Sequence, residues 1–366
     1  CGSKMVGWVF WVMIALMVTI LWHVYQQLVL GNYDAVEKKL KNRVHHNTPT
    51  ILMLCLLLPI CIYLSWAPSS CHARTALAIV LLWTAPSKLI LLIFFSTEFD
   101  SAPWITSSFS HFLVALLLPI RILGTRNAHN KNFFSISLPS AAHNSIKALV
   151  LLGVMNIYPH FHAIPEALLY LLYCIHFYLG IMLPMDSLAA IVASIYGVEV
   201  AEQFNIPIMA ETLEEFWGKR WNRTVHSLLK ETVYKPVLAL NGKRGSTSVK
   251  KKWVAMVSTF GVSAVMHEII FVVVSRSPPT GEMSVFFLLH GLVTSIRKPN
   301  LGHIELPKWM KHVTTCCILY ITVSIFFLRP LRRSGTDRQA IAEYHHFQSS
   351  ILYLSHKLIS WISSWI

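Results

Sequence analysis

The 366-residue chain is poor in charge. Charged residues make up 13% of its positions, whereas hydrophobic residues make up 54%. A soluble globular domain carries about 25% charged residues, so this chain lacks the polar surface that such a domain exposes to water. The composition therefore indicates a protein embedded in a lipid bilayer, with most side chains facing lipid or buried between helices.

Cysteine pairs and the common nucleotide and hydrolase motifs are also missing. The seven cysteines form no Cys-X-X-Cys pair and most lie in or beside apolar segments, so they indicate neither a zinc site nor a disulfide framework. No GxSxG, P-loop or strand-linked GxGxxG is present, which disfavours serine-hydrolase, nucleotide-hydrolysis and dinucleotide chemistry. His267-Glu268 resembles the start of a zincin motif, but the second histidine is replaced by Phe271.

Apolar segments close to the length of a membrane crossing recur along the whole chain. A helix needs roughly 20 apolar residues to cross the hydrocarbon core, and several of these segments are shorter or contain proline. We therefore predict an all-α polytopic membrane protein with about eight to ten transmembrane or re-entrant helices. The segments are Val6–Leu30, Pro49–Ala67, Thr75–Phe95, Trp104–Leu123, Ser145–Tyr158, Ile164–Met185, Ser187–Val200, Trp253–Ser275, Val285–Ile296 and Val313–Leu328.

Three segments carry more specific expectations. Val6–Leu30 is too long for the apolar part of a cleavable signal peptide, so we expect an uncleaved signal anchor. Thr75–Phe95 is interrupted by a Pro-Ser-Lys stretch, so we expect that it does not cross the membrane fully. Ser350–Ile366 carries Trp361 and Trp365, which are typical of an apolar segment lying at the membrane interface.

The net charge of +14 is unevenly distributed. Between Gly218 and Lys252 there are ten Lys or Arg residues and a single acid, Glu231. The positive-inside rule explains such a segment as a cytoplasmic loop; a second explanation is that it receives a polyanionic, phosphate-bearing substrate. Nucleic acid is not an expected partner, because the basic residues are confined to short loops between apolar segments.

An aromatic and cationic segment, Glu211–Pro236, precedes the apolar stretch that carries His267. Thr212 followed by Glu215 has capping-box spacing and predicts a helix through Leu213–Leu229. Periodicity alone favours an interfacial helix, although the amide of Asn222 is able to fix a reactant if it turns inward. One side of this helix would carry Phe216, Arg220 and Arg223, and another would carry Trp217, Trp221 and Leu228.

His267 and Glu268 lie inside the apolar stretch Trp253–Ser275. Ionisable residues at membrane depth are costly, and they usually face a cavity and mark a pathway or a reaction centre. A packed, hydrogen-bonded structural histidine is the simpler explanation, and a proton-coupling pair in a transporter is another. His290, on the next apolar segment, either faces His267 or lines the bundle.

Four ordered motifs carry a family resemblance. They are Phe216-Trp217-Gly218-Lys219-Arg220-Trp221-Asn222, Thr232-Val233-Tyr234-Lys235-Pro236-Val237, Val262-Ser263-Ala264-Val265-Met266-His267-Glu268-Ile269-Ile270-Phe271 and Phe286-Phe287-Leu288-Leu289-His290-Gly291. Together they resemble the membrane-bound O-acyltransferase superfamily, and most closely its plant wax-synthase-like branch. The resemblance implies helices around an intramembrane reaction chamber, with N-terminal transmembrane helices in residues 1–143, a catalytic core in 144–330 and a C-terminal tail in 331–366.

The resemblance also implies a reaction and its residues. An acyl group passes from acyl-CoA, a co-substrate, to a long-chain fatty alcohol or a sterol in the endoplasmic-reticulum membrane, with no metal or other cofactor. His267 matches the catalytic histidine, which as a neutral imidazole accepts the hydroxyl proton during attack on the thioester; Asn222 would orient it or the thioester carbonyl. The expected substrate-binding residues are Phe216, Trp217, Lys219, Arg220, Trp221, Arg223, Glu268 and His290, with the three cations placed to hold CoA phosphates.

Other functions stay open at this point. The acceptor is alternatively diacylglycerol, or the donor is alternatively acetyl-CoA, because apolar composition does not reveal pocket length. A polytopic lipid transporter is the non-enzymatic alternative. One departure from the branch follows Gly291, where the chain soon reaches Arg297-Lys298-Pro299 instead of continuing an apolar helix with an acidic residue; we expect an altered pocket wall near His290.

Overall fold

A computed structural model describes residues 2–26, 48–94, 104–105, 107–125, 138–240, 249–295, 307–363 and 365. The described chain is mostly helical, and five of its helical segments are long and apolar enough to cross a membrane. The predicted polytopic helical architecture is therefore confirmed, and the protein is an integral membrane protein. The five segments are Trp8–Tyr25, Cys71–Leu92, Glu166–Tyr196, Val249–Ser275 and Lys308–Arg333, and two shorter apolar helices are Cys55–Trp66 and Glu282–Ser295.

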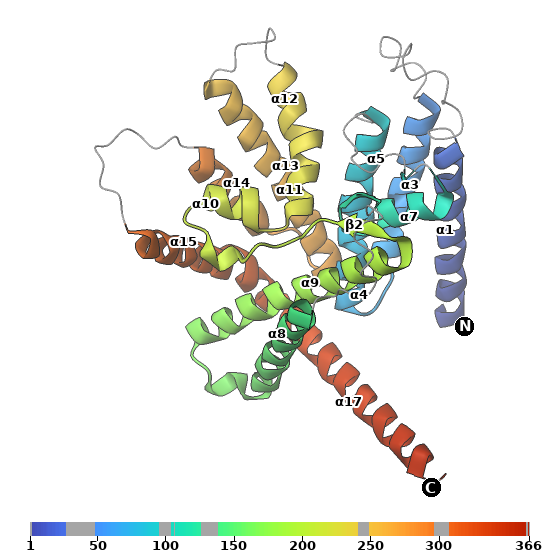
Figure 1. Ribbon diagram of the computed structural model, residues 1–366, viewed down its shortest axis with the longest axis vertical. Coiled ribbons are helices and arrows are strands. Elements are labelled where there is room, and N and C mark those ends of the chain that lie inside the picture. Colours follow the sequence, from blue (N-terminus) through green and yellow to red (C-terminus); the bar gives the residue numbers. More distant parts are fainter. Residues whose placement is uncertain are drawn as a thin grey trace.

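Figure 1 labels many of the helices and one strand. Here α and β denote helices and strands, and η denotes a π- or 3₁₀-helical segment. In chain order they are α1 (Gly2–Tyr25), α3 (Thr48–Trp66), α4 (Cys71–Leu77), η2 (Ala78–Thr84), α5 (Ala85–Phe94), α7 (Phe109–Leu117), β1 (Ile122–Thr125), α8 (Leu138–Ile157), η4 (Tyr158–Ala163), α9 (Glu166–Tyr196), β2 (Val198–Val200), η5 (Pro207–Met209), α10 (Leu213–Glu215), η6 (Phe216–Arg220), α11 (Arg223–Leu229), η7 (Lys230–Tyr234), α12 (Lys235–Leu240), α13 (Val249–Ser275), α14 (Glu282–Ser295), α15 (Lys308–Val323), η8 (Ser324–Leu328), α16 (Arg329–Arg333) and α17 (Thr336–Ser363).

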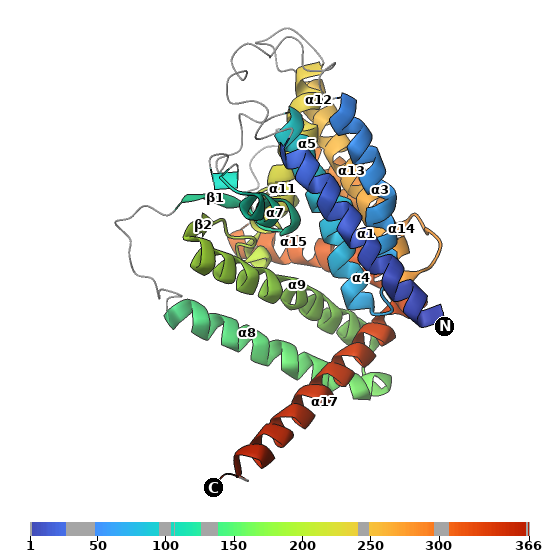
Figure 2. The same cartoon turned by 90° about the vertical axis from the view of Figure 1, so that its right-hand side faces the viewer.

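The helices near the N-terminus form one side of a bundle. Helices α1 and α3 lie side by side, and α13 packs against the helical segment that runs from α4 through η2 (Figures 1 and 2). The apolar core among α1, α3, α5 and α7 includes Leu21, Leu64 and Phe112, which are almost fully buried. Helices α8 and α9 pair with each other and cross this bundle at a steep angle. Helix α13 is therefore in contact with η2, a segment almost 200 residues earlier in the chain.

The predicted crossing Trp104–Leu123 is wrong as a single helix. Helix α7 ends at Leu117, and Leu118 has extended backbone angles because the residue before a proline, here Pro119, is disfavoured in the helical region. The chain continues into β1, which pairs antiparallel with β2 and places Ile122 opposite Val200. This two-stranded sheet is a small exception to the all-α prediction.

Two other predicted segments, Ile164–Met185 and Ser187–Val200, form one continuous helix, α9, up to Tyr196. Asp186, the acid that separated them in the sequence, lies 3.8 Å from the ammonium of Lys147 on α8. The ion pair lets the charge remain within the helix. Helix α9 ends at Gly197, whose φ of 62° is left-handed and therefore favours glycine.

The segment Thr75–Phe95, expected not to cross fully, is helical throughout its described part. Its polar interruption, Lys88, is only 4% exposed. The ammonium donates to carbonyl oxygens at the end of α7, where a helix leaves its last carbonyls unpaired. The three acceptors are Ala115 and Leu118, both at 2.6 Å, and Ile120 at 2.9 Å. We expected an incomplete crossing because of the charge of Lys88, but this charge is hydrogen-bonded to carbonyl oxygens within the protein. The helical segment Cys71–Leu92 is long and apolar enough to cross the membrane.

The C-terminal segment belongs to a long helix. Helix α17 projects beyond the other helices in both views (Figures 1 and 2), and every residue from Ile351 to Trp361 is exposed. An exposed apolar surface of this kind suits contact with lipid. The interfacial position of Ser350–Ile366 stays a prediction. The end of the predicted anchor Val6–Leu30, from residue 27 onward, lies outside the described residues.

The buried ammonium of Lys88 leads to a stability prediction. Lys88→Met removes the donor to three carbonyls, and each buried acceptor left unpaired costs about 1–3 kcal/mol. We expect the thermal unfolding midpoint in detergent to fall by on the order of 5 °C. Lys357→Met is the control, because it changes an exposed lysine of α17. Equal losses in the two variants, measured by fluorescence-detected gel filtration after heating, would contradict this account of Lys88.

Candidate active site

Helices α13 and α14 form a hairpin that Glu268 fastens. Its Oε1 atom accepts hydrogen bonds from the backbone N–H groups of Thr280 and Gly281, both at 2.7 Å. Its Oε2 atom accepts from the N–H of Ser284 at 3.2 Å and from the hydroxyl of the same residue at 3.1 Å. The first N–H groups of a helix lack intrahelical partners, so the carboxylate caps α14. The structure thus uses Glu268, an expected substrate ligand, to hold the hairpin.

Close packing in the hairpin depends on Gly291. A Cβ atom at this position would lie 2.6 Å from the Cβ of Phe260 on α13, a distance that side chains do not tolerate. The missing side chain lets α14 approach α13 and keeps the aromatic residues of α14 against the face of α13 that carries His267.

His267 lies on α13, half-buried, with its Nδ1 atom 2.8 Å from the carbonyl oxygen of Ser263. A carbonyl can only accept, so Nδ1 carries the proton and Nε2 of the neutral ring is an acceptor. Among the described residues, Nε2 has no hydrogen-bond partner. The ring stacks on Phe287, with centroids 3.8 Å apart and planes at 25°, and meets the ring of Trp83 nearly edge-on at 4.6 Å and 83°. His267 is therefore an oriented acceptor within an aromatic enclosure.

His290 is held in the same way but has both ring nitrogens engaged. It is 1% exposed, its Nδ1 lies 2.9 Å from the carbonyl oxygen of Phe286, and its Nε2 lies 3.3 Å from the hydroxyl of Thr322. No ring contact or hydrogen bond joins it to His267 in the described part of the chain. His290 lines the bundle, and of the two histidines only His267 keeps an unengaged Nε2. The altered sequence after Gly291 lies outside the described residues from Ile296 onward.

The predicted helix through Leu213–Leu229 is wrong. The capping contact is present, with the N–H of Glu215 donating to Thr212 Oγ1 at 3.1 Å, but η6 is π-helical and the chain leaves the helix at Trp221 and Asn222. Here the backbone pairs with another segment instead: the N–H of Arg223 donates to the carbonyl of residue 203, and the carbonyl of residue 220 accepts from the N–H of residue 205, both at 2.9 Å.

This break rearranges the expected faces. Residues five apart lie about 140° apart around an α-helix, yet Phe216 and Trp221 stack with centroids 5.5 Å apart and planes at 18°. Trp217 points instead toward the hairpin, where its ring lies 5.7 Å from that of Phe287 and 5.7 Å from that of His290. The string Phe216–Asn222, called the Phe-Trp motif below, therefore contacts Phe287, and the ring of Phe287 stacks on His267.

The expected cationic face does not form. Arg220 donates from Nε to Glu215 at 2.8 Å and from Nη1 to the carbonyl oxygen of Asn205 at 3.1 Å, so its guanidinium braces the turn. Arg223 lies 3.5 Å from Glu202 at the surface. Lys219 is exposed and, among the described residues, makes no ion pair. Residues 241–248 of the basic segment lie outside the described part of the chain.

Asn222 is a capping residue in the structure. Its backbone is left-handed, with φ 37° and ψ 65°, and its Oδ1 atom accepts from the N–H of Val225 at 3.2 Å. Asparagine suits both roles, because it tolerates this conformation better than most residues and caps helices well. Where the structure describes both side chains, Asn222 and His267 form no hydrogen bond with each other.

Contacts of His267 that the motifs did not predict come from distant parts of the chain. Trp83 lies in η2, and Phe327 of η8 places its ring 6.1 Å from the imidazole. A tryptophan or phenylalanine in an apolar segment carries no signal that separates it from ordinary packing, so sequence reasoning missed both. Phe287 had a usable signal, because it lies in the motif Phe286–Gly291 that contains His290.

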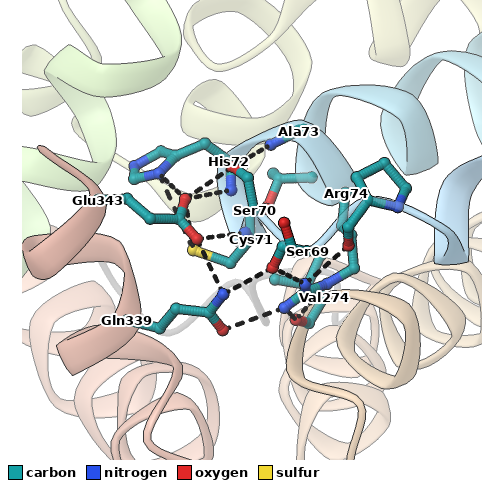
Figure 3. Close-up of polar contacts among 11 residues, drawn as sticks. Ser69, Ser70, Cys71, His72, Ala73, Arg74, Val274, Gln339 and Glu343 are labelled. Atoms are coloured by element: carbon teal, nitrogen blue, oxygen red, sulfur yellow. Dashed lines mark hydrogen bonds and ion pairs between the residues drawn. The ribbon is translucent and has the colours of Figure 1, made fainter. Parts of the chain in front are cut away.

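A second polar cluster joins α17 to the start of α4 (Figure 3). Glu343 accepts hydrogen bonds from the N–H of Cys71 and the hydroxyl of Ser70, both at 2.7 Å, and lies 2.8 Å from Nδ1 of His72. Donor atoms of Cys71, His72 and Glu343 lie within 4.8 Å of one another, a spacing that a metal ion can use. The hydrogen bonds already account for the cluster, because the carboxylate caps the unpaired N–H groups of α4.

Comparisons with known proteins cover the part of the chain that holds this site. The model of the membrane bound O-acyl transferase family matches residues 200–289, which include Asn222 and His267. A long-chain-alcohol O-fatty-acyltransferase of Simmondsia chinensis is 32% identical over 306 residues, covering 80% of this chain and 85% of that protein. An acyl-CoA–sterol O-acyltransferase of Arabidopsis thaliana is 28% identical over 316 residues, covering 85% and 89%. A probable long-chain-alcohol O-fatty-acyltransferase of the same plant is 29% identical over 308 residues, covering 80% and 86%.

The chain therefore belongs to the membrane bound O-acyl transferase family, and the resemblance carried by the four motifs is confirmed. Within that family the protein is an O-acyltransferase of the wax synthase and sterol acyltransferase kind.

The contact between Glu343 and α4 leads to a pH prediction. Burial alone would raise the pKa of Glu343, but hydrogen bonds from His72, Cys71 and Ser70 outweigh it and lower the pKa from 4.5 to about 2. A carboxyl group with a depressed folded-state pKa stabilises the fold fully above its unfolded pKa, and this contribution is lost as the pH falls from 4.5 toward 2. Glu343→Gln should lower the unfolding midpoint most above pH 4.5.

The difference between Glu343→Gln and wild type should shrink in acid. The matched control is Glu199→Gln, which changes an exposed glutamate of β2. A difference that stays constant from pH 6 down to pH 3 would show that the carboxylate charge does not hold the two helices together.

Proposed function

We propose that the protein transfers the acyl group of an acyl-CoA to the hydroxyl of a lipid alcohol in the endoplasmic-reticulum membrane, with His267 as the general base. The observation that carries this proposal is the orientation of His267: its Nδ1 is engaged by the Ser263 carbonyl at 2.8 Å, and Nε2 has no partner among the described residues. The acceptor is a long-chain fatty alcohol or a sterol, the two substrates named in the relatives.

The chemistry needs one proton acceptor. An alcohol is a poor nucleophile while it keeps its proton, so Nε2 of His267 takes that proton as the oxygen attacks the thioester carbonyl carbon. The tetrahedral intermediate then collapses, the C–S bond breaks, and the imidazolium returns the proton to the leaving sulfur. The products are an ester and the free thiol of CoA. The Ser263 carbonyl supports this cycle because it keeps Nδ1 protonated and the ring in one orientation.

The main role of the Phe-Trp motif in this proposal is to position aromatic side chains near His267, and only Lys219 is assigned a contact with the charged part of CoA. Asn222 caps α11 at the point where the chain leaves the helix, and the turn fixes Trp217 against Phe287. We assign Asn222 a positioning role toward the catalytic histidine through this turn. Lys219 is the exposed cation proposed to meet a phosphate of CoA, since Arg220 is engaged by Glu215. The apolar helices of residues 1–143 and 144–330 together would accommodate the acyl chain and the alcohol.

Substitution of His267 tests the base. His267→Gln keeps a polar side chain of similar size but accepts no proton, and general base catalysis contributes about 10²- to 10⁴-fold. We expect ester synthesis in microsomes to fall at least ~100-fold, with labelled acyl-CoA as donor and a fatty alcohol, a sterol and diacylglycerol as separate acceptors. His356→Gln, on the exposed part of α17, is the control and should keep wild-type activity. Full turnover by a folded, inserted His267→Gln protein would refute the proposed mechanism.

The role of Lys219 is testable separately. Lys219→Ala should raise the apparent KM for acyl-CoA several-fold and leave the KM for the alcohol unchanged, because only the donor carries phosphates. Lys357→Ala removes an exposed lysine from α17 and should change neither constant. An equal rise in both KM values for Lys219→Ala would argue against a phosphate contact.

A further inference from the structure

One hydrogen-bond donor beside His267 has no partner within the described part of the chain. Trp83 is 6% exposed, and its indole Nε1 is buried with no hydrogen-bond partner among the residues that the structure describes. Nearly all buried polar groups in native proteins are hydrogen-bonded, and each exception calls for an explanation. Buried tryptophans in particular place the indole N–H against an acceptor. An unpaired donor in apolar surroundings costs free energy, and a ligand bound against His267 would supply the missing acceptor.

The location of Trp83 is specific to the active site. Its ring centroid lies 4.6 Å from that of His267, with the two planes at 83°. Trp83 belongs to the π-helical segment η2, and π-helical turns occur frequently at functional sites because the wider turn redirects the following side chains. The same segment packs on α13, where Ala78 and Leu82 form a buried apolar cluster with Val273. The indole is thus held rigidly beside the imidazole.

We propose that Trp83 is a further catalytic residue, whose indole N–H donates a hydrogen bond to the carbonyl oxygen of the acyl thioester. This assignment rests on the proposed function, because it needs a thioester at His267. When the alcohol oxygen bonds to the carbonyl carbon, the C=O π electrons move to the carbonyl oxygen, which becomes an oxyanion. The alcohol proton goes to Nε2 of His267. A fixed donor in a low-dielectric site stabilises the new negative charge without reorganisation.

Other donors around the imidazole fit this role less well. Trp217 also has a buried indole Nε1 without a partner, but its ring contacts Phe287 and His290, with no ring contact to His267 among the described residues. Asn222 is engaged at the start of α11. Arg220, the nearest cation of the Phe-Trp motif, is paired with Glu215. The hydroxyl of Ser263 lies 3.4 Å from Nδ1 of His267, the nitrogen that does not take the alcohol proton. Among the described residues, Trp83 combines a ring contact with the proposed base and a buried N–H without a partner.

The test removes the N–H and keeps the ring. Trp83→Phe is compared with Trp104→Phe, which is matched because Trp104 is also 6% exposed and stacks on a histidine, His111, at 4.2 Å. Removing an oxyanion donor costs about 10²- to 10³-fold in kcat, so we expect Trp83→Phe to lose roughly 100-fold in kcat with the KM for acyl-CoA nearly unchanged and the pH profile of kcat unmoved. Trp104→Phe should keep its kcat.

A second substitution guards against a folding defect. Benzothienylalanine, introduced at position 83 by codon suppression, replaces the indole N–H with sulfur in a ring of nearly the same shape. A comparable loss of kcat supports the proposal, whereas kcat close to wild type overturns it. A shift of the pH profile in either variant also overturns it, because Trp83 would then act through His267.

The outcomes separate this proposal from the function itself. If wild-type protein makes no ester from any donor and acceptor pair, the proposed function fails and the role of Trp83 fails with it. If wild type is active and His267→Gln is inactive, but both position-83 variants turn over normally, only the role of Trp83 is refuted.

Discussion

Polar groups inside a bilayer have to find their partners within the protein, because hydrocarbon supplies none. This constraint accounts for most of the polar contacts in the described bundle. Lys88 donates to three carbonyls at the end of α7, Glu268 caps α14, and His290 engages both ring nitrogens. Against this background, the rings of His267 and Trp83 lie next to each other, and among the described residues neither Nε2 of His267 nor the indole N–H of Trp83 has a hydrogen-bond partner. In the proposed mechanism, a reacting alcohol and thioester would meet these two groups.

The hairpin of α13 and α14 gives that centre its rigidity. Glu268 fixes where α14 begins, and Gly291 lets α14 approach Phe260 closely enough to press its aromatic face against α13. Phe287 consequently stacks on His267 at 3.8 Å. The glutamate next to the histidine therefore holds the hairpin that carries the site, which explains why an ionisable pair is found at this depth.

The irregular backbone of the Phe-Trp motif also fixes aromatic side chains near His267. A regular helix would spread Phe216 and Trp221 over different faces, whereas the π-helical turn and the left-handed Asn222 stack these two rings together and direct Trp217 to the hairpin. The arginines that periodicity assigned to a cationic face brace this turn or pair at the surface instead. The segment acts as a structured lining beside the histidine.

The sequence by itself determined the membrane environment, the helical class, the family and the candidate base, because hydrophobic composition and short ordered motifs are local properties that survive without coordinates. It also located most of the apolar helices. It misplaced the end of α7, because Pro119 ends that helix early, and it divided α9 in two, because it did not reveal that Lys147 pairs with Asp186. Only the tertiary structure decided which polar side chains are hydrogen-bonded within the protein and which have no partner among the described residues. Arg220, Glu268 and Asn222 look like ligands in the sequence and are hydrogen-bonded within the protein, while Trp83 looks like packing and carries an unpaired donor. Hydrogen-bond partners come from residues far apart in the chain, so their assignment depends on how the helices pack.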